Sequence, residues 1–253
     1  MILLAFVEGG HGLETKGKET PLVADLKRRI KENEFNDAVV ELLCGELDRH
    51  NISVYDVAPG HSDIPLKTRV DKANEIYANY VKKYGRENVN AVYVSIHFNA
   101  FDGTFGGRNP SGFSVHIQPT DAKKKSAKLG KLILEELALG TKQVNRGLVL
   151  QNLYVTRETH VPACLVECGF MDSPDEVKLM LDKDFHAEVA REVTTGILRY
   201  FGKRYVKPIE KPKATESKEL YRVQVGAFSN RENAEKMVAK AKSLGLDAFV
   251  VKG

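Results

Sequence analysis

The feature that most constrains the fold is an alternation of apolar, strand-like stretches with segments whose apolar residues recur at helical spacing. Residues 91–96 (AVYVSI) are almost entirely apolar, which is typical of a strand covered on both faces of a sheet. Residues 66–84 place Val70, Ala73 and Tyr77 on one side of a helix instead. The alternation predicts an α/β fold, with a mostly parallel central sheet flanked by helices on both faces. We expect strands at 2–8, 52–57, 91–96, 112–118, 153–156 and 163–167, and helices at 34–50, 66–84, 122–139, 174–181 and 184–201.

The pattern stops after residue 202, which indicates a domain boundary. Residues 203–218 are charged and contain two prolines, a composition typical of a linker. Residues 219–253 then predict a small C-terminal βαβ unit, too small for an independent core. We expect this unit to pack on the first domain, on a second copy of itself or on a ligand. The predicted organisation is a domain over 1–202, a linker over 203–218 and a small unit over 219–253.

Charge and hydropathy exclude two classes of partner. The 253 residues carry a formal net charge of +4. From residue 203 onward, twelve Lys and Arg residues outnumber six Asp and Glu residues, whereas the preceding part has 26 basic and 28 acidic residues. A uniformly basic nucleic-acid binder is therefore not expected. No apolar run reaches about 18 residues, so we expect no transmembrane helix and no membrane partner.

The cysteines and the N-terminal stretch suggest where the chain is made. Cys44, Cys164 and Cys168 are odd in number and form no CxxC motif, so we interpret them as buried free thiols from a reducing compartment. The apolar start of the chain lacks the basic region and cleavage site of a signal peptide. We expect synthesis in the cytoplasm without a signal peptide.

Four polar residues stand where a site is expected. His11, His97 and Glu167 follow or end predicted strands, and Glu34 opens a predicted helix. In an open α/β sheet, ligands bind beyond the carboxyl ends of the strands. Two histidines and one carboxylate are a common ligand set for catalytic zinc, and a second carboxylate beside it can move a proton. Each residue alone has a structural alternative, as a loop, strand-end or helix-start residue. Their convergence on one edge favours a metal site.

Several motifs occur together in a known order. They are GGHG (9–12), the helix start at Glu34, LKTRVDKAN (66–74), SIHFNA (95–100), NRG (145–147) and LYVTRETHVPACLVECGFMDSPDE (153–176). This run resembles the zinc-dependent N-acetylmuramoyl-L-alanine amidases of the amidase type 3 family, which occur in bacterial autolysins, spore-lysis enzymes and phage endolysins. The resemblance covers residues 1–202.

The resemblance implies a role for each candidate residue. His11, Glu34 and His97 would bind Zn²⁺, and Glu167 would be the catalytic carboxylate. The family hydrolyses the amide between N-acetylmuramic acid and L-alanine in peptidoglycan, with zinc-activated water and a glutamate that accepts and returns a proton. Glu8 stands where the family usually has Asp, and whether it supports a ligand is open. Residues 13–32 could form a mobile loop over the site.

The C-terminal part has a resemblance of its own. Residues 221–253 are similar to one half of a SPOR domain, a module that binds peptidoglycan glycan strands. Because a complete module needs two halves, we expect two chains to pair through this half repeat as a homodimer. The resemblance implies action on the cell wall after the chain leaves the cytoplasm. It would leave by release that depends on a holin or on lysis, or by non-classical export.

Two other functions stay open at this point. One is a zinc peptidase that cuts within the peptidoglycan stem peptide, and the other is a non-catalytic wall-binding protein. Of the other five histidines, His116 and His160 are the two to test for closeness to the zinc. Residues 123–125 (Lys-Lys-Lys) are interpreted as a solvated helix start that could contact anionic wall polymers.

Overall fold

The computed structural model describes residues 1–106, 109–121, 124–208, 226–246 and 248–251. It divides into two compact units, Met1–Val206 and Lys207–Gly253. The first unit contains the sheet and the candidate site residues, and each unit is described by itself.

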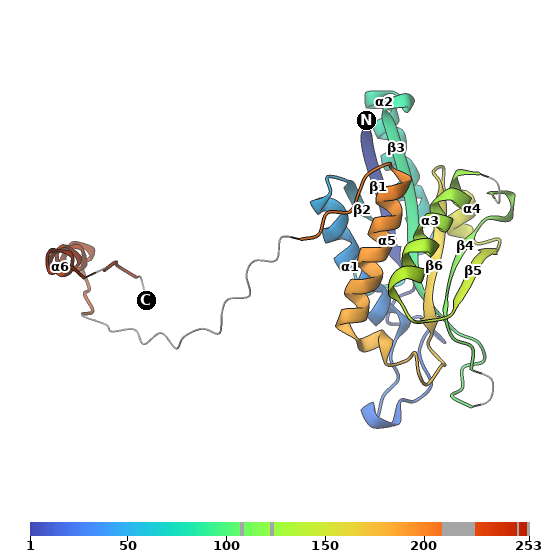
Figure 1. Ribbon diagram of the computed structural model, residues 1–253, viewed down its shortest axis with the longest axis horizontal. Helices are drawn as coiled ribbons and strands as arrows, with labels where there is room; N and C mark the ends of the chain where they lie inside the picture. Colours follow the sequence, from blue (N-terminus) through green and yellow to red (C-terminus); the bar gives the residue numbers. More distant parts are fainter. Residues whose placement is uncertain (107–108, 122–123, 209–225, 247, 252–253) are drawn as a thin grey trace. The chain divides into compact units, whose positions relative to one another are not determined.

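The first unit is built on a six-stranded sheet with the strand order β2-β1-β3-β6-β4-β5 (Figure 1). The strands are β1 (Ile2–Gly9), β2 (Ser53–Asp56), β3 (Val89–Asn99), β4 (Phe113–Ile117), β5 (Asn145–Leu150) and β6 (Ala163–Phe170). Neighbouring strands run parallel, except that β4 runs antiparallel to β6. The predicted mostly parallel sheet is confirmed.

Helices cover both faces of this sheet, as predicted. They are α1 (Glu32–Arg49), α2 (Leu66–Tyr84), α3 (Lys125–Gly140), α4 (Tyr154–Glu158) and α5 (Lys183–Tyr200). Short 3₁₀ segments are η1 (Ala24–Leu26), η2 (Arg86–Asn88), η3 (Pro119–Asp121) and η4 (Leu179–Leu181). Helix α5 packs between α1 and α3 on one face of the sheet (Figure 1). On the other face, α2 contacts α4.

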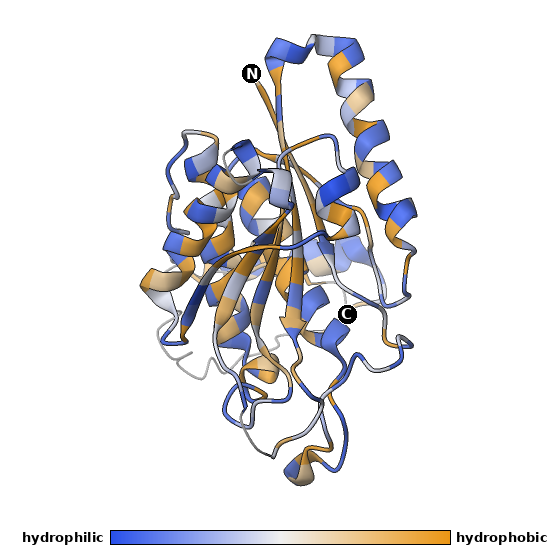
Figure 2. Ribbon diagram, turned by 90° about the vertical axis from the view of Figure 1, so that its right-hand side faces the viewer, coloured by the Kyte–Doolittle hydropathy of each residue, from blue (hydrophilic) through white to orange (hydrophobic). Residues whose placement is uncertain are grey.

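The core consists of two hydrophobic clusters, one on each side of the sheet. Successive side chains of a strand point to opposite faces. In β3, Val94 therefore joins the cluster under α1, α3 and α5, while Tyr93 joins the cluster under α2. The strands accordingly carry long hydrophobic stretches, drawn orange in Figure 2.

Two predicted elements are wrong. Residues 153–156 were expected to form a strand, but Leu153 is the N-cap of α4 and residues 154–156 belong to that helix, where Val155 packs into the α2-side cluster. A short apolar run does not by itself distinguish a strand from a helix. The strand at this end of the sheet is instead β5. The helix expected at 174–181 is reduced to η4, and before it the Glu176 side chain accepts hydrogen bonds from the N–H groups of Gly112 and Phe170.

The chain continues to contact the first unit for several residues beyond the predicted end of the domain. Lys203 Nζ donates to the His50 carbonyl at 2.7 Å, and the Val206 N–H donates to His50 Nε2 at 3.0 Å. The Tyr205 ring packs against the His50 ring at 4.9 Å between centroids. The start of the charged segment is thus bound to α1.

In the second unit, the predicted helix is α6 (Arg231–Ser243). The Asn230 side chain caps it by accepting a hydrogen bond from the Glu232 N–H. Residues 220–225 and 247, which belong to the two expected strands, lie outside the described residues. The described parts of those strands, 226–228 and 248–251, are not in strand conformation. Among the described residues of the whole chain, no helix is both long and apolar enough to cross a membrane.

Candidate metal centre and active site

The first histidine of the site lies just beyond the end of β1. His11 has a φ of 63°, in the left-handed region that few residues other than glycine adopt. Two buried amides hold this turn, because Asn36 Nδ2 donates to the Gly10 carbonyl at 3.0 Å and Asn33 Nδ2 to the His11 carbonyl at 3.1 Å. A Cβ on Gly10 would lie 2.0 Å from the ring of His97. Glycine is therefore required for the two chain segments to approach.

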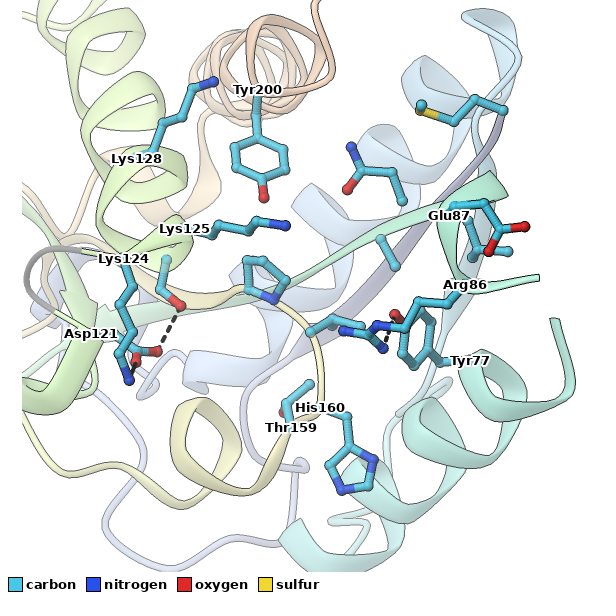
Figure 3. Close-up of a pocket in the computed structure, with 17 residues that line it drawn as sticks. Tyr77, Arg86, Glu87, Asp121, Lys124, Lys125, Lys128, Thr159, His160 and Tyr200 are labelled. Atoms are coloured by element: carbon cyan, nitrogen blue, oxygen red, sulfur yellow. Dashed lines mark hydrogen bonds and ion pairs between the residues drawn. The ribbon is translucent and has the colours of Figure 1, made fainter. Parts of the chain in front are cut away.

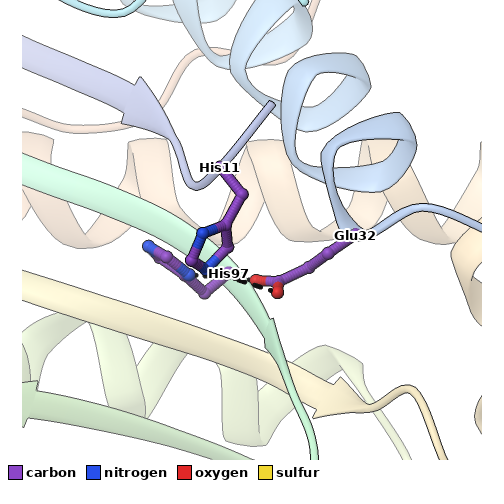
Figure 4. Close-up of side chains that lie close together, drawn as sticks. All are labelled: His11, Glu32 and His97. Carbon is purple, nitrogen blue, oxygen red and sulfur yellow. Dashed lines mark hydrogen bonds and ion pairs between the residues drawn. The ribbon is translucent and has the colours of Figure 1, made fainter. Parts of the chain in front are cut away.

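Three side chains converge at this edge of the sheet (Figure 4). His97 Nδ1 lies 2.9 Å from Glu32 Oε1, and His11 Nε2 lies 3.5 Å from Glu32 Oε2. The two imidazole rings are 5.1 Å apart and nearly perpendicular. One ligand atom from each residue lies within 4.8 Å of the others, which is close enough for a single metal ion to bind all three.

The structure corrects the carboxylate of the predicted ligand set, since it brings Glu32 rather than Glu34 to the histidines. The Glu34 carboxylate faces away and binds Arg28 through two hydrogen bonds of 2.8 and 3.0 Å. It also accepts the Lys31 N–H at 2.8 Å, as part of a capping box at the start of α1. The Glu34 side chain therefore stabilises the start of α1.

Helical periodicity explains why Glu32 rather than Glu34 lies beside the histidines, and it could have identified Glu32 from the sequence. Successive helical residues are rotated by about 100°, so positions two apart point to nearly opposite sides. Glu32 lies on the side of the buried Phe35 and Val39, three and seven residues further on, whereas Glu34 does not. The missed signal was that α1 begins two residues earlier than predicted, with Glu32 in its first turn.

Glu32 is positioned by further hydrogen bonds. It is 1% exposed, and its Oε1 accepts the Phe98 N–H at 3.1 Å and Asn36 Nδ2 at 3.2 Å. Burial by itself would raise the pKa of Glu32, but the hydrogen bond to His97 and the charges of both histidines hold it below its usual value. The carboxylate is therefore ionised and fixed in place.

The two histidines have opposite electrostatic surroundings. Burial lowers the pKa of His11 to about 4, and the charge of Glu32 offsets this only in part. Burial also acts to lower the pKa of His97, but its hydrogen bond to Glu32 and the charge of that residue outweigh burial, so its pKa is raised. His11 consequently presents a neutral imidazole at pH 7, the form that binds metals.

Glu167 lies next to this cluster on β6. It is opposite His97 on one neighbouring strand and opposite Ser114 on the other. Its Oε2 is buried with no hydrogen-bond partner among the described residues. Burial raises the pKa of Glu167 to about 7, with the charge of His97 opposing the rise and that of Glu32 adding to it. A carboxyl group with a pKa near 7 is suited to both accepting and donating a proton.

The Glu8 side chain forms a buried ion pair and is not part of the cluster of His11, Glu32 and His97. It is fully buried and pairs with Arg69 of α2 at 2.8 Å. The same guanidinium also donates to the Gly9 carbonyl at 3.1 Å and lies 3.0 Å from Asp63. Arg69 thus ties the end of β1, which carries His11, to α2. This gives the answer to the role of Glu8 that the sequence left open.

The two further histidines that the sequence analysis singled out, His116 and His160, are not in the cluster. His116 Nδ1 lies 2.6 Å from Gln151 Oε1, and His116 Nε2 lies 2.9 Å from Ser114 Oγ. His160 is exposed, and its N–H donates to Asn74 Oδ1 at 2.8 Å. Within residues 13–32, for which the sequence predicts a mobile loop, the Lys18 carbonyl accepts the Glu32 N–H and Glu19 forms a β-bridge with Lys31. The mobility of this loop stays a prediction.

Two acidic side chains fix the loops beside the site. Asp172 Oδ2 accepts hydrogen bonds from the N–H groups of three consecutive residues, 101–103, at 2.7–2.9 Å. Glu176 accepts from the N–H groups of Gly112 and Phe170. The segment that follows His97 is therefore anchored to the segment that follows Glu167.

Comparison with known proteins decides the family. A family model described as N-acetylmuramoyl-L-alanine amidase matches residues 6–199, well over half of the chain. The chain belongs to this amidase family. A second model, described as the SPOR domain, matches residues 203–253.

Relatives of similar length support this membership of the amidase family. N-acetylmuramoyl-L-alanine amidase CwlM of Bacillus licheniformis is 28% identical over 247 residues, which cover 97% of this chain and 83% of the relative. The sporulation-specific N-acetylmuramoyl-L-alanine amidase of Bacillus subtilis (strain 168) is 27% identical over 242 residues, covering 96% and 78%. The crystal structure of the amidase from Clostridium difficile 630 matches with a TM-score of 0.67 at 27% identity, covering 79% of this chain and 97% of that one.

Family membership establishes the reaction class. The chain is a hydrolase of the amidase family, which cleaves the bond between N-acetylmuramic acid and L-alanine in peptidoglycan. This confirms the activity that the motif resemblance implied, in preference to a stem-peptide peptidase or a non-catalytic wall-binding protein.

Proposed function

We propose that this amidase is zinc-dependent, with His11, Glu32 and His97 as the metal ligands and Glu167 as the catalytic acid and base. The observation that carries the proposal is the convergence of one ligand atom from each of His11, Glu32 and His97 beside the Glu167 carboxyl group, whose buried Oε2 has no hydrogen-bond partner among the described residues. Glu32 replaces Glu34 in the ligand set for the reasons given above.

The donor set fits zinc. Two imidazole nitrogens and one carboxylate oxygen are a usual ligand set for catalytic zinc, which leaves one coordination position open. His11 is neutral, and Glu32 is ionised and fixed by its contacts with the Phe98 N–H and Asn36. Such supporting hydrogen bonds orient metal ligands in proteins. When bound, zinc supplies Lewis-acid polarisation of the scissile carbonyl and acidification of water.

The chain's own residues supply the proton transfers. Glu167 accepts a proton from the attacking water and returns it to the departing nitrogen of L-alanine. Its buried position and a pKa near 7 suit a group that must be a base in one step and an acid in the next. The Arg69–Glu8 pair and the amides of Asn33 and Asn36 keep the ligands in position during this exchange.

Metal analysis combined with digestion of purified cell walls tests the proposal. We expect one zinc per chain, loss of lysis after chelation and recovery when zinc is restored. Glu167→Gln should bind zinc normally and fail to lyse walls, because the amide cannot accept the proton. Mass spectrometry of the products should show free lactyl groups and intact stem peptides. Lysis that resists chelation, or a fully active Glu167→Gln variant, would contradict the mechanism.

The match of residues 203–253 to the SPOR domain supports a further proposal, that this segment binds peptidoglycan. Pairing of two chains through it stays a prediction. Sedimentation equilibrium of the full chain should then show a concentration-dependent dimer, whereas a monomer at all concentrations would exclude pairing.

We also propose that the chain is made in the cytoplasm and reaches the wall by release on lysis or by non-classical export. The three cysteines are all free, which is compatible with synthesis in a reducing compartment. Cell fractionation before and after lysis tests this, and the proposal fails if the chain is exported with a cleaved leader.

A further inference from the structure

Figure 3 shows a large, open cavity. It lies at the end of the sheet opposite to the metal centre. Its volume is about 1030 Å³. It is bounded by the first residues of β3 and the residues just before β6, together with the start of α3, the end of α5, Tyr77 of α2 and the short helix η2. The metal centre, in contrast, lies at the carboxyl ends of β1 and β3. The cavity is therefore separate from the site that cleaves the amide.

Among the charged side chains of the described residues that line this cavity, the basic ones outnumber the acidic ones. Four cationic side chains, those of Arg86, Lys124, Lys125 and Lys128, outnumber the two anionic ones of Glu87 and Asp121. The lysines come from the start of α3 on one side, and Arg86 lies across the cavity near Tyr77 (Figure 3). Positive charge therefore faces the cavity from two separate elements.

The contacts of these four cations do not neutralise their charge. Lys124 lies 3.3 Å from Asp121, but its side chain is 65% exposed. Lys128 lies over the Tyr200 ring at 5.6 Å, and Arg86 donates to the Tyr77 hydroxyl at 2.7 Å. These two contacts are with neutral groups and do not cancel charge. Lys125 has no ion pair or hydrogen bond through its side chain within the described part of the chain, and it extends into the cavity (Figure 3).

The start of α3 adds to this preference for an anion. The helix spans Lys125–Gly140, and Lys124 at its N-cap position provides no side-chain cap. A helix start carries a partial positive charge, and lysines in its first turn would ordinarily be unfavourable there. Lys124, Lys125 and Lys128 are thus concentrated where a bound anion would relieve their repulsion.

We propose that this cavity binds a linear phosphate-bearing polymer attached to peptidoglycan. The volume exceeds that of a single phosphate group, and cations on two sides suit a ligand that presents several negative charges along its length. We assign the polymer to the cell wall because the amidase acts on peptidoglycan, and this assignment alone rests on the function. Such binding would hold the enzyme on the wall through a surface distant from the metal centre.

Binding of the full chain to purified walls tests the proposal, with walls that retain their phosphodiester polymers compared with walls freed of them by hydrofluoric acid. The double variant Lys124→Glu/Lys125→Glu reverses two charges at the cavity. The matched control Lys131→Glu/Lys142→Glu makes the same charge change on exposed lysines of and just beyond α3 that do not line the cavity. We expect about tenfold weaker binding of the cavity variant to untreated walls at low salt, and less than about twofold change for the control.

Binding to extracted walls, hydrolysis of a soluble substrate and binding to DNA complete the test. On extracted walls the cavity variant and the parent chain should bind alike, and both double variants should hydrolyse a small soluble muramoyl-peptide as the parent does. Equal weakening by the two double variants would overturn the proposal, because it would indicate general charge attraction. Equal binding of the parent to extracted and untreated walls would also overturn it. Tighter cavity-dependent binding to DNA than to untreated walls would show that the ligand is a nucleic acid and that the wall assignment is wrong.

Discussion

The two ends of the sheet in residues 1–206 differ in the burial of their charged side chains. Those at the carboxyl end are buried and paired, whereas lysines at the amino end are exposed. At the carboxyl end, Glu32 and the Glu8–Arg69 pair are about 1% exposed, and each is bound to defined partners. At the amino end, Lys124 is 65% exposed and Lys125 has no ion pair among the described residues. Burying a charge is costly unless it is paired and hydrogen-bonded, so the buried end requires one geometry. The exposed end needs only an excess of charge, which suits a flexible polymer.

Two glutamates two residues apart give the sharpest test of this difference. Glu32→Gln should reduce wall lysis more than about 100-fold and lower the zinc content, because an amide is a much poorer ligand than a carboxylate. Glu34→Gln, which loses only the partly exposed pair with Arg28, should stay within about threefold of the parent. Rates of lysis and zinc per chain measure both effects. The reverse ranking would restore Glu34 as the ligand and refute the geometry described above.

The second prediction concerns the buried ion pair beneath the site. Arg69→Met leaves Glu8 buried without its partner and should destabilise the first unit by about 3–5 kcal/mol. Lys67→Met on the same helix removes an exposed pair with Asp71 and should leave stability nearly unchanged. Urea unfolding of the full chain measures both variants. Similar losses for the two would mean that burial does not govern the contribution of these pairs.

The third prediction concerns the loop after His97. Asp172→Ala removes the acceptor of three backbone N–H groups and should cost about 1–3 kcal/mol of stability. Asp172→Asn keeps one oxygen acceptor and should recover a large part of that loss. Unfolding free energies together with proteolytic cleavage of residues 100–106 would measure the effect. Unchanged protease resistance of Asp172→Ala would show that this carboxylate does not anchor the loop.

The smallest expected effect is a pH dependence from Glu192 on α5. Burial raises its pKa from 4.5 to about 8, and the charge of Glu188 adds to this rise while Arg191 opposes it. The folded chain therefore holds this proton more tightly than the unfolded chain. Its contribution to stability is fully present below pH 4.5 and is lost as the pH rises through 8.

Glu192→Gln should accordingly weaken the decline in stability between pH 4.5 and 8, by roughly 1–2 kcal/mol after allowance for relaxation of the site. Glu188→Gln, which removes only a neighbouring charge, should change the slope less. Thermal unfolding followed across this pH range measures the difference between the two variants. An identical pH profile for the parent and Glu192→Gln would show that Glu192 ionises freely in the folded chain.

Much of the fold and site could be predicted from the sequence because local patterns carry the information. The apolar stretches and helical spacings predicted the parallel α/β sheet with two covered faces. They also placed His11, His97 and Glu167 at strand ends, and strand ends on one edge of a parallel sheet lie together whatever the packing details. The charged composition after residue 202 also predicts a linker and a small C-terminal unit, and the compact first unit of the structure ends at Val206.

Tertiary structure decided what local patterns leave ambiguous. The antiparallel direction of β4 and the helical state of residues 154–158 depend on which neighbours each segment packs against. The choice between Glu32 and Glu34 depends on the residue at which α1 begins, and a shift of two residues turns a side chain to the opposite side of a helix. The sequence alone determined which kinds of side chain meet at the site, whereas packing decided which glutamate is among them.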